Sequence, residues 1–125
     1  MELISRQSAP AYAAGGTTVT GYAAPSRGAT QVSLWRIELE PGSSSPLHEI
    51  DVEEVFLGLE GRAVAIVDGG ESTVTAGDCL VVPARTPFTL TAGPETSFKA
   101  VVCMPAGGRA TVLPDGPTFV PPWAE

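Results

Sequence analysis

The sequence has few cysteines, which could cross-link a small protein, and few lysines and arginines, which could attract polyanions. Its 125 residues include two cysteines, one histidine, and seven lysines and arginines against fourteen aspartates and glutamates. The net charge of -7 repels nucleic-acid phosphates and anionic lipid headgroups, so we expect no nucleic acid and no membrane as partner. Cys79 and Cys103 each lie in an apolar run, which is typical of small buried residues and not of a disulfide framework.

Long apolar segments and helical periodicity are also missing. No run approaches the roughly 20 apolar residues of a transmembrane helix, and the start, MELISRQSAP, lacks the basic and apolar regions of a secretion signal. We therefore expect a cytoplasmic protein. Fourteen glycines and twelve prolines interrupt the chain, yet 43% of its residues are hydrophobic, a combination that favours short strands over helices or disorder.

Alternating residues and turn signals predict a series of short strands. In residues 31–39, one face collects every second residue: Ser33, Trp35, Ile37 and Leu39. The predicted strands are residues 17–22, 31–39, 52–59, 62–67, 72–75, 79–82, 88–91, 96–104 and 109–113. Such spacing is typical of an antiparallel sandwich or barrel. We expect a single domain with an N-terminal arm (1–29), a barrel (30–113) and an irregular Pro-rich tail (114–125), anchored by Phe119 and Trp123.

Residues 42–61 and 77–88 resemble the two signature motifs of the cupin superfamily. The matching positions are Gly42, His48, Glu54 and Gly61 in the first motif and Gly77 and Pro83 in the second. The resemblance implies an all-β fold, an antiparallel jelly-roll β-barrel. It also implies a homodimer, because small cupins often pair through their sheets and exchange N-terminal strands. The segment 17–22 looks detached enough to be exchanged.

The sequence departs from the family pattern where the family binds a metal ion. Ile50 stands at a histidine position of the first motif, while Arg85 and Phe88 replace a glycine and a histidine of the second. His48 and Glu54 supply two ligands, whereas a tight divalent site needs three or four. We therefore predict no cofactor, or a weak iron or zinc site on these two residues. The acidic neighbours are expected on a solvated strand face: Glu49, Asp51 and Glu53.

With hydrocarbon at two of the four metal-binding points, the barrel centre is predicted to hold a small organic ligand. The expected lining is Trp35, His48, Ile50, Glu54, Phe56, Arg85 and Phe88. Arg85 lies in a loop beside the mouth, where it could orient a carboxylate. His48 beside Glu54 is a candidate acid or base, since a neighbouring carboxylate favours the imidazolium while burial opposes it. A hydrogen bond between the two would equally satisfy two buried groups without catalysis.

Three functions remain open on the sequence. The first is a small-molecule-binding protein with an apolar barrel pocket and an incomplete metal site. The second is a metal-independent isomerase, cyclase or lyase that uses His48 as general base and Glu54 to orient it. The third is a metal-dependent oxygenase or isomerase in which water and substrate complete the coordination shell, and Phe88 counts against it.

Overall fold

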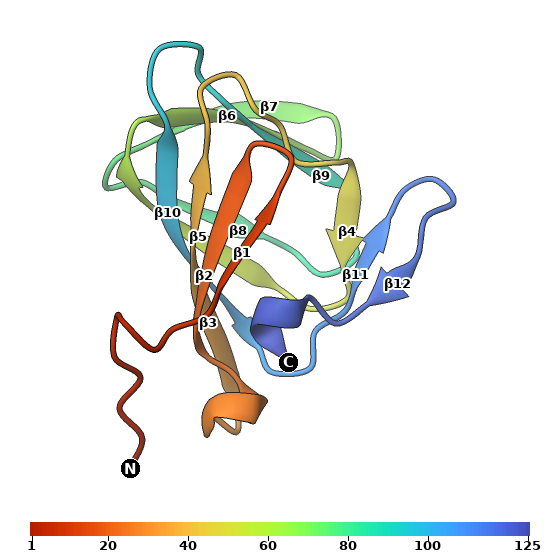
Figure 1. The fold of residues 1–125 in the computed structure, drawn as a ribbon. Coiled ribbons are helices and arrows are strands. Elements are labelled where there is room, and N and C mark those ends of the chain that lie inside the picture. The colour runs from red at the N-terminus through yellow and green to blue at the C-terminus, as the bar shows by residue number, and fades with distance from the viewer.

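The computed structural model describes all 125 residues, and nearly all of its regular structure is β-strand (Figure 1). The strands are β1 (Ala11–Ala14), β2 (Thr17–Ala23), β3 (Val32–Leu39), β4 (His48–Ile50), β5 (Glu54–Glu60), β6 (Arg62–Val67), β7 (Gly70–Thr75), β8 (Cys79–Val82), β9 (Phe88–Ala92), β10 (Phe98–Pro105), β11 (Ala110–Val112) and β12 (Thr118–Phe119). Two short 3-10 helices are η1 (Pro25–Arg27) and η2 (Pro122–Ala124). No helix has the length and apolar character needed to cross a membrane.

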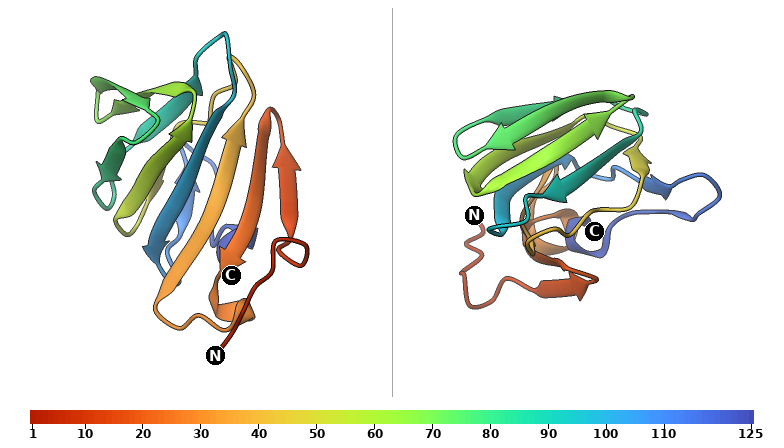
Figure 2. Two further views of the ribbon diagram at one scale, coloured as in Figure 1. Left: turned by 90° about the vertical axis from the view of Figure 1, so that its left-hand side faces the viewer. Right: turned by 90° about the horizontal axis from the view of Figure 1, so that it is seen from above.

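The strands form two six-stranded sheets that face each other as layers (Figure 2). Sheet A has the order β1-β2-β3-β10-β5-β8, and sheet B has the order β12-β11-β4-β9-β6-β7. Neighbouring strands are antiparallel throughout. The predicted all-β, antiparallel jelly-roll barrel is therefore confirmed. Apolar side chains point into the space between the sheets, the largest fully buried ones being Phe88, Phe98, Leu39 and Met104.

Strand β3 shows how the sequence pattern selects the inward face. Trp35, Ile37 and Leu39 are at most 7% exposed, whereas the intervening Arg36 is exposed. Because β2 and β10 pair with β3 on either side, this strand is central in sheet A. Burying each large apolar side chain stabilises the fold by about 1.5–3 kcal/mol. The predicted alternation in residues 31–39 is therefore confirmed and places Trp35 inside the barrel.

The turns between strands depend on backbone geometry that the motif residues supply. Gly61 joins β5 to β6 with φ at 72°, a conformation that residues with a side chain rarely adopt. A side chain here would also collide with the Ser97 carbonyl group. In the turn before β8, the Thr75 backbone N–H and hydroxyl both donate to Asp78 Oδ2 at 2.9 Å, and these bonds lower the pKa of Asp78.

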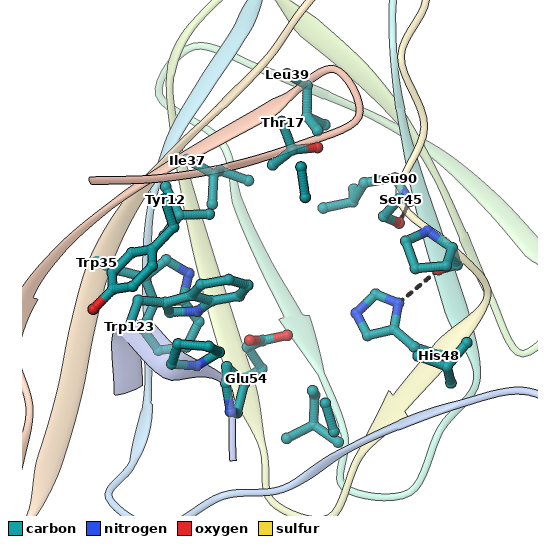
Figure 3. A pocket seen from close by; sticks show the side chains of 18 of the residues that line it. Tyr12, Thr17, Trp35, Ile37, Leu39, Ser45, His48, Glu54, Leu90 and Trp123 are labelled. Atoms are coloured by element: carbon teal, nitrogen blue, oxygen red, sulfur yellow. Dashed lines mark hydrogen bonds between the residues drawn. The ribbon is translucent and has the colours of Figure 1, made fainter. Parts of the chain in front are cut away.

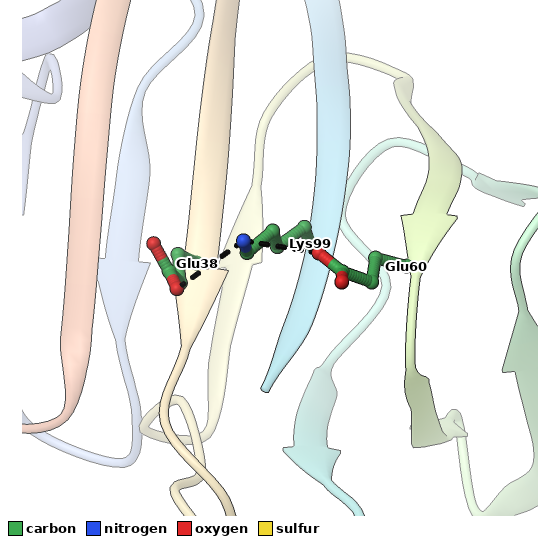
Figure 4. Close-up of polar contacts among 3 residues, drawn as sticks. All are labelled: Glu38, Glu60 and Lys99. Atoms are coloured by element: carbon green, nitrogen blue, oxygen red, sulfur yellow. Dashed lines mark ion pairs between the residues drawn. The ribbon is translucent and has the colours of Figure 1, made fainter. Parts of the chain in front are cut away.

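The outer face of sheet A carries one row of charges. Lys99 on β10 lies between two carboxylates on the neighbouring strands (Figure 4). Its Nζ is 3.0 Å from Glu60 Oε2 and 3.8 Å from Glu38 Oε1. The hydrogen bond that Lys99 donates to Glu60, followed by the charges of Glu38 and Glu60, raises the pKa of Lys99. One positive and two negative side chains leave a single negative charge on this row, a small part of the net charge of -7.

A group of apolar side chains lies beside this row and next to Arg36, and we call it the outer apolar face. Its members are Leu34, Val55, Leu57, Val81, Val101 and Cys103, which lie side by side on β3, β10, β5 and β8. Leu57 is 43% exposed and Val81 is 51% exposed. Cys79 lies on the same face and is exposed, which corrects the expectation that both cysteines are buried. Both thiols are free, and partial burial raises the pKa of Cys103.

The N-terminal arm is more ordered than the sequence suggested. Strand β2 contains the segment 17–22 and pairs with both β1 and β3, so that Val19 is only 3% exposed. The expectation of a single, detached strand in this arm is therefore wrong. An additional strand, β1, covers the edge of β2. Exchange of 17–22 between subunits would require breaking these pairs, while the homodimer itself stays a prediction.

The C-terminal tail also contains regular structure that the prolines had argued against. Strand β12 pairs with β11, and helix η2 packs on β2 and β3. Trp123 anchors the tail as predicted, with its ring centroid 6.0 Å from that of Tyr12 and 6.4 Å from that of Trp35. Phe119 remains 38% exposed and is a poorer anchor than expected. The Ser33 hydroxyl donates to the Ala124 carbonyl at 3.0 Å and fixes the chain end.

Candidate functional site

A cavity of about 500 Å³ lies between the two sheets and is lined mainly by apolar side chains (Figure 3). Both sheets contribute, through residues of β1, β2, β3 and β5 on one side and β4, β9 and β11 on the other. Six of the predicted lining residues are present: Trp35, His48, Ile50, Glu54, Phe56 and Phe88. Sequence reasoning missed Tyr12 and Trp123, which come from opposite ends of the chain and line the cavity beside Trp35.

Arg85 does not line the cavity, contrary to expectation. Its backbone has φ at 57°, and its N–H donates to the Ile50 carbonyl at 2.6 Å, so the turn ties β4 to the loop before β9. The side chain is exposed. No other lysine or arginine is among the lining residues. The cavity therefore lacks the cation that we expected to orient a carboxylate.

His48 begins β4, and its imidazole reaches into the cavity (Figure 3). Its Nδ1 lies 2.7 Å from the carbonyl oxygen of Pro46. Since a carbonyl oxygen only accepts hydrogen bonds, Nδ1 carries the proton and the neutral ring presents Nε2 as an acceptor. Burial lowers the pKa of His48 and outweighs the opposing effect of the Pro46 bond. The ring is therefore neutral at pH 7 and faces the cavity with a lone pair.

Glu54 begins β5 on the opposite wall and is 4% exposed. No group in the protein hydrogen-bonds its Oε1, and burial raises its pKa to about 8. Leaving a buried polar group without a partner costs about 1–3 kcal/mol, so a partner in the cavity would stabilise this side chain. At pH 7 the carboxyl group is mostly protonated and can donate a hydrogen bond as well as accept one.

The expected hydrogen bond between His48 and Glu54 is not formed. The two side chains face each other across the cavity, with open space between them (Figure 3). The group that orients the imidazole is the Pro46 carbonyl, and Glu54 has no such role. Neither reading of this pair from the sequence, as an oriented base or as two mutually satisfied polar groups, fits this geometry. Because every residue type has a backbone carbonyl, the identity of residue 46 gives no signal of this hydrogen bond.

The residues of the site do not fit a tightly held metal ion. Phe88 is the direct partner of His48 in the pairing of β4 with β9, and their ring centroids are 4.3 Å apart. Ile50, two residues further along β4, is 4% exposed. Glu53 is exposed and cannot add a ligand. Nowhere in the protein do three or more His, Cys, Asp or Glu side chains gather as a cation site, whereas a tight divalent site needs three or four ligands.

Residues 35–104 match the family model described as a cupin domain. This region is more than half of the chain and includes both sequence motifs. The chain belongs to the cupin domain family. A comparison of this cupin with curated protein sequences gives no match.

Solved structures with similar folds include enzymes of several kinds. The polyketide cyclase RemF from Streptomyces resistomycificus has a TM-score of 0.77 and 22% identity, over 98% of this cupin and 88% of that chain. Salicylate 1,2-dioxygenase from Pseudoaminobacter salicylatoxidans has a TM-score of 0.73 and 22% identity, over 85% of this cupin and 31% of the dioxygenase. A sugar phosphate isomerase from Silicibacter pomeroyi has a TM-score of 0.66 and 22% identity, over 78% and 65%. These likenesses establish the shared fold.

Proposed function

We propose that this cupin binds a small, largely apolar organic molecule inside the barrel, with His48 and Glu54 contacting its polar groups. The observation that carries this proposal is the cavity of about 500 Å³ between the sheets. Ligand sites in proteins are typically clefts of roughly 300–1,000 Å³ with apolar walls and a few polar groups. The aromatic rings of Trp35, Phe56 and Phe88 supply such walls, and the two titratable side chains supply the polar groups.

A thermal-shift screen with neutral aromatic compounds tests the proposal. A ligand present at 100 times its dissociation constant should stabilise the protein by about 2.7 kcal/mol. Val112→Phe, at a half-buried position on the cavity wall, should weaken this stabilisation because the ring takes up part of the space. Ile66→Phe makes a similar change at a 45% exposed position outside the cavity and should leave it intact. Ligands that stabilise both variants equally, or none that stabilises the wild type, would count against binding in the barrel.

A second candidate is a metal-independent isomerase, cyclase or lyase. It is favoured by the pairing, across one cavity, of a neutral base in His48 with a protonated acid in Glu54. His48 Nε2 would take a proton from the carbon next to a bound carbonyl group while the Glu54 carboxyl group gives one to the carbonyl oxygen, which yields a neutral enol and leaves an imidazolium and a carboxylate on the protein. RemF, which is named as a polyketide cyclase, shares the fold. This likeness supports the second candidate by analogy alone.

Turnover separates the two candidates. A positioned acid or base contributes roughly 100- to 10,000-fold to a reaction rate. His48→Ala should therefore lower turnover of a reactive ligand at least about 100-fold while its affinity changes much less. If the wild type binds a ligand and releases it chemically unchanged, the result supports ligand binding and counts against catalysis.

A further inference from the structure

The cavity contains no positively charged side chain to receive an anionic ligand. Its lining residues include no lysine or arginine, and Arg85 is exposed outside it. Among the polar lining residues, the Ser45 hydroxyl accepts a hydrogen bond from the Leu90 N–H at 2.9 Å and keeps one proton to donate, but it carries no charge. A carboxylate or phosphate entering this space would lose its hydration without gaining a counter-charge. The ligand is therefore expected to be uncharged.

The hydrogen-bonding role of His48 is set by the backbone. Nδ1 donates to the Pro46 carbonyl at 2.7 Å, and burial keeps the ring neutral, so Nε2 is left to accept; it points into the cavity (Figure 3). The neighbouring face of the ring is covered by Phe88, at a centroid distance of 4.3 Å. A ligand group that meets Nε2 must therefore bring a hydrogen-bond donor, such as a hydroxyl.

Glu54 supplies the complementary group on the opposite wall. It is 4% exposed, and no cation or hydrogen-bond donor of the protein contacts its carboxyl group. Two buried side-chain polar atoms in the protein lack a partner, Glu54 Oε1 and Trp123 Nε1, and both belong to residues that line this cavity. A neutral carboxyl group in such surroundings donates to an acceptor such as a carbonyl oxygen.

We propose that the ligand of this cavity is an uncharged aromatic hydroxy-carbonyl compound. Its hydroxyl donates to His48 Nε2, its carbonyl oxygen accepts from the Glu54 carboxyl group, and its ring system lies among the aromatic walls. This inference rests on the proposed function and narrows it, because it excludes carboxylates, phosphates and plain hydrocarbons as preferred ligands.

Calorimetric titration with four naphthalene compounds at neutral pH tests the inference. The complete probe is 6-acetyl-2-naphthol, which has a hydroxyl and a carbonyl at opposite ends. The compounds 2-acetylnaphthalene and 2-naphthol each lack one of these groups, and we expect each to bind about tenfold more weakly, as for one lost hydrogen bond. The fourth, 6-hydroxy-2-naphthoate, carries a carboxylate in place of the ketone and should bind at least about 100-fold more weakly.

Substitutions of His48 and Glu54 test which residue causes the preference for the hydroxyl group and which causes the preference for the carbonyl group. His48→Phe keeps a flat ring but removes the acceptor, so it should abolish the tenfold advantage of the hydroxyl and retain that of the carbonyl. Glu54→Leu should do the reverse, whereas Glu54→Gln, whose amide still donates, should keep the preference for the carbonyl. Arg85→Gln is the matched control outside the cavity and should change none of the four affinities.

The outcomes separate this inference from the proposed function. If the naphthalene compounds bind but the naphthoate binds as tightly as the ketone, or if both preferences survive in His48→Phe and Glu54→Leu, the inference is overturned while binding in the barrel stands. If none of the compounds binds and the thermal-shift screen also finds no ligand, the proposed function fails and the inference fails with it.

Discussion

Replacing Glu54 with glutamine should remove a pH-dependent loss of stability from this cupin. In the folded protein, burial raises the pKa of Glu54 from 4.5 to about 8. Between these two values the folded state binds more protons than the unfolded state, so the free energy of unfolding falls as the pH rises. The difference of about 3.5 between the two pKa values corresponds to a loss of unfolding free energy on the order of 5 kcal/mol. Most of this loss occurs between pH 4.5 and pH 8, and it is complete above the pKa of the folded state.

Urea unfolding at several pH values between 4.5 and 8 measures this loss. The two tryptophans, Trp35 and Trp123, both line the cavity and report unfolding by fluorescence. The stability of the wild type relative to Glu54→Gln should fall by several kcal/mol across this range. Burial lowers the pKa of His48, which makes stability rise with pH up to about its ordinary value of 6.5, but this effect is common to both proteins and cancels in the difference.

The matched control for this experiment is Glu53→Gln. Glu53 is the exposed neighbour of the buried carboxyl group, and its substitution should leave the pH dependence of stability unchanged. A difference between wild type and Glu54→Gln that stays constant with pH would refute the reasoning. So would a wild type that gains stability relative to this variant as the pH rises, because the carboxylate would then have a stabilising partner in the folded state.

Three other variants test the remaining parts of the structure. The double variant Ile50→His and Phe88→His adds two imidazoles beside the existing pair of ligands, and calorimetry with zinc should show binding much tighter than that of the wild type. Leu57→Glu, on the outer apolar face, should convert the predicted homodimer to monomer in analytical ultracentrifugation if that face joins the subunits, while a wild type already monomeric would contradict the predicted dimer. Ser33→Ala should lower the free energy of unfolding by about 1–2 kcal/mol in urea titrations, because the Ala124 carbonyl loses its partner.

The strands of this cupin could be predicted because their signals are local. Alternation in residues 31–39 identified the inward face of β3, and spaced glycines and prolines marked most of the turns. Strand β1 was missed because its sequence, AYAA, has neither alternation nor strong β propensity, and pairing with β2 forms it. Cys79 was predicted to be buried because its neighbours are apolar, yet it lies on the outward side of an edge strand.

The content of the barrel was partly predictable from spacing within the motifs. The motif positions indicated that Ile50 and Phe88 would stand near His48, and the pairing of β4 with β9 puts Phe88 directly opposite it. Arg85 was misplaced because loop residues follow no period, and the backbone of its turn is bonded to β4. The relation between His48 and Glu54 was also unpredictable, since the width of the cavity separates side chains that are close in the sequence.

The sequence by itself determined the all-β architecture and the replacement of imidazole by hydrocarbon at two motif positions, because strand periodicity and motif spacing are read over a few residues. Tertiary structure decided which distant residues line the cavity together and which groups within it are left without partners. Tyr12 and Trp123 meet there from opposite ends of the chain, and Glu54 remains unpaired because the facing strand holds its histidine against a backbone carbonyl. The distance between the two sheets and the meeting of the chain ends are set by the fold as a whole, which no local pattern encodes.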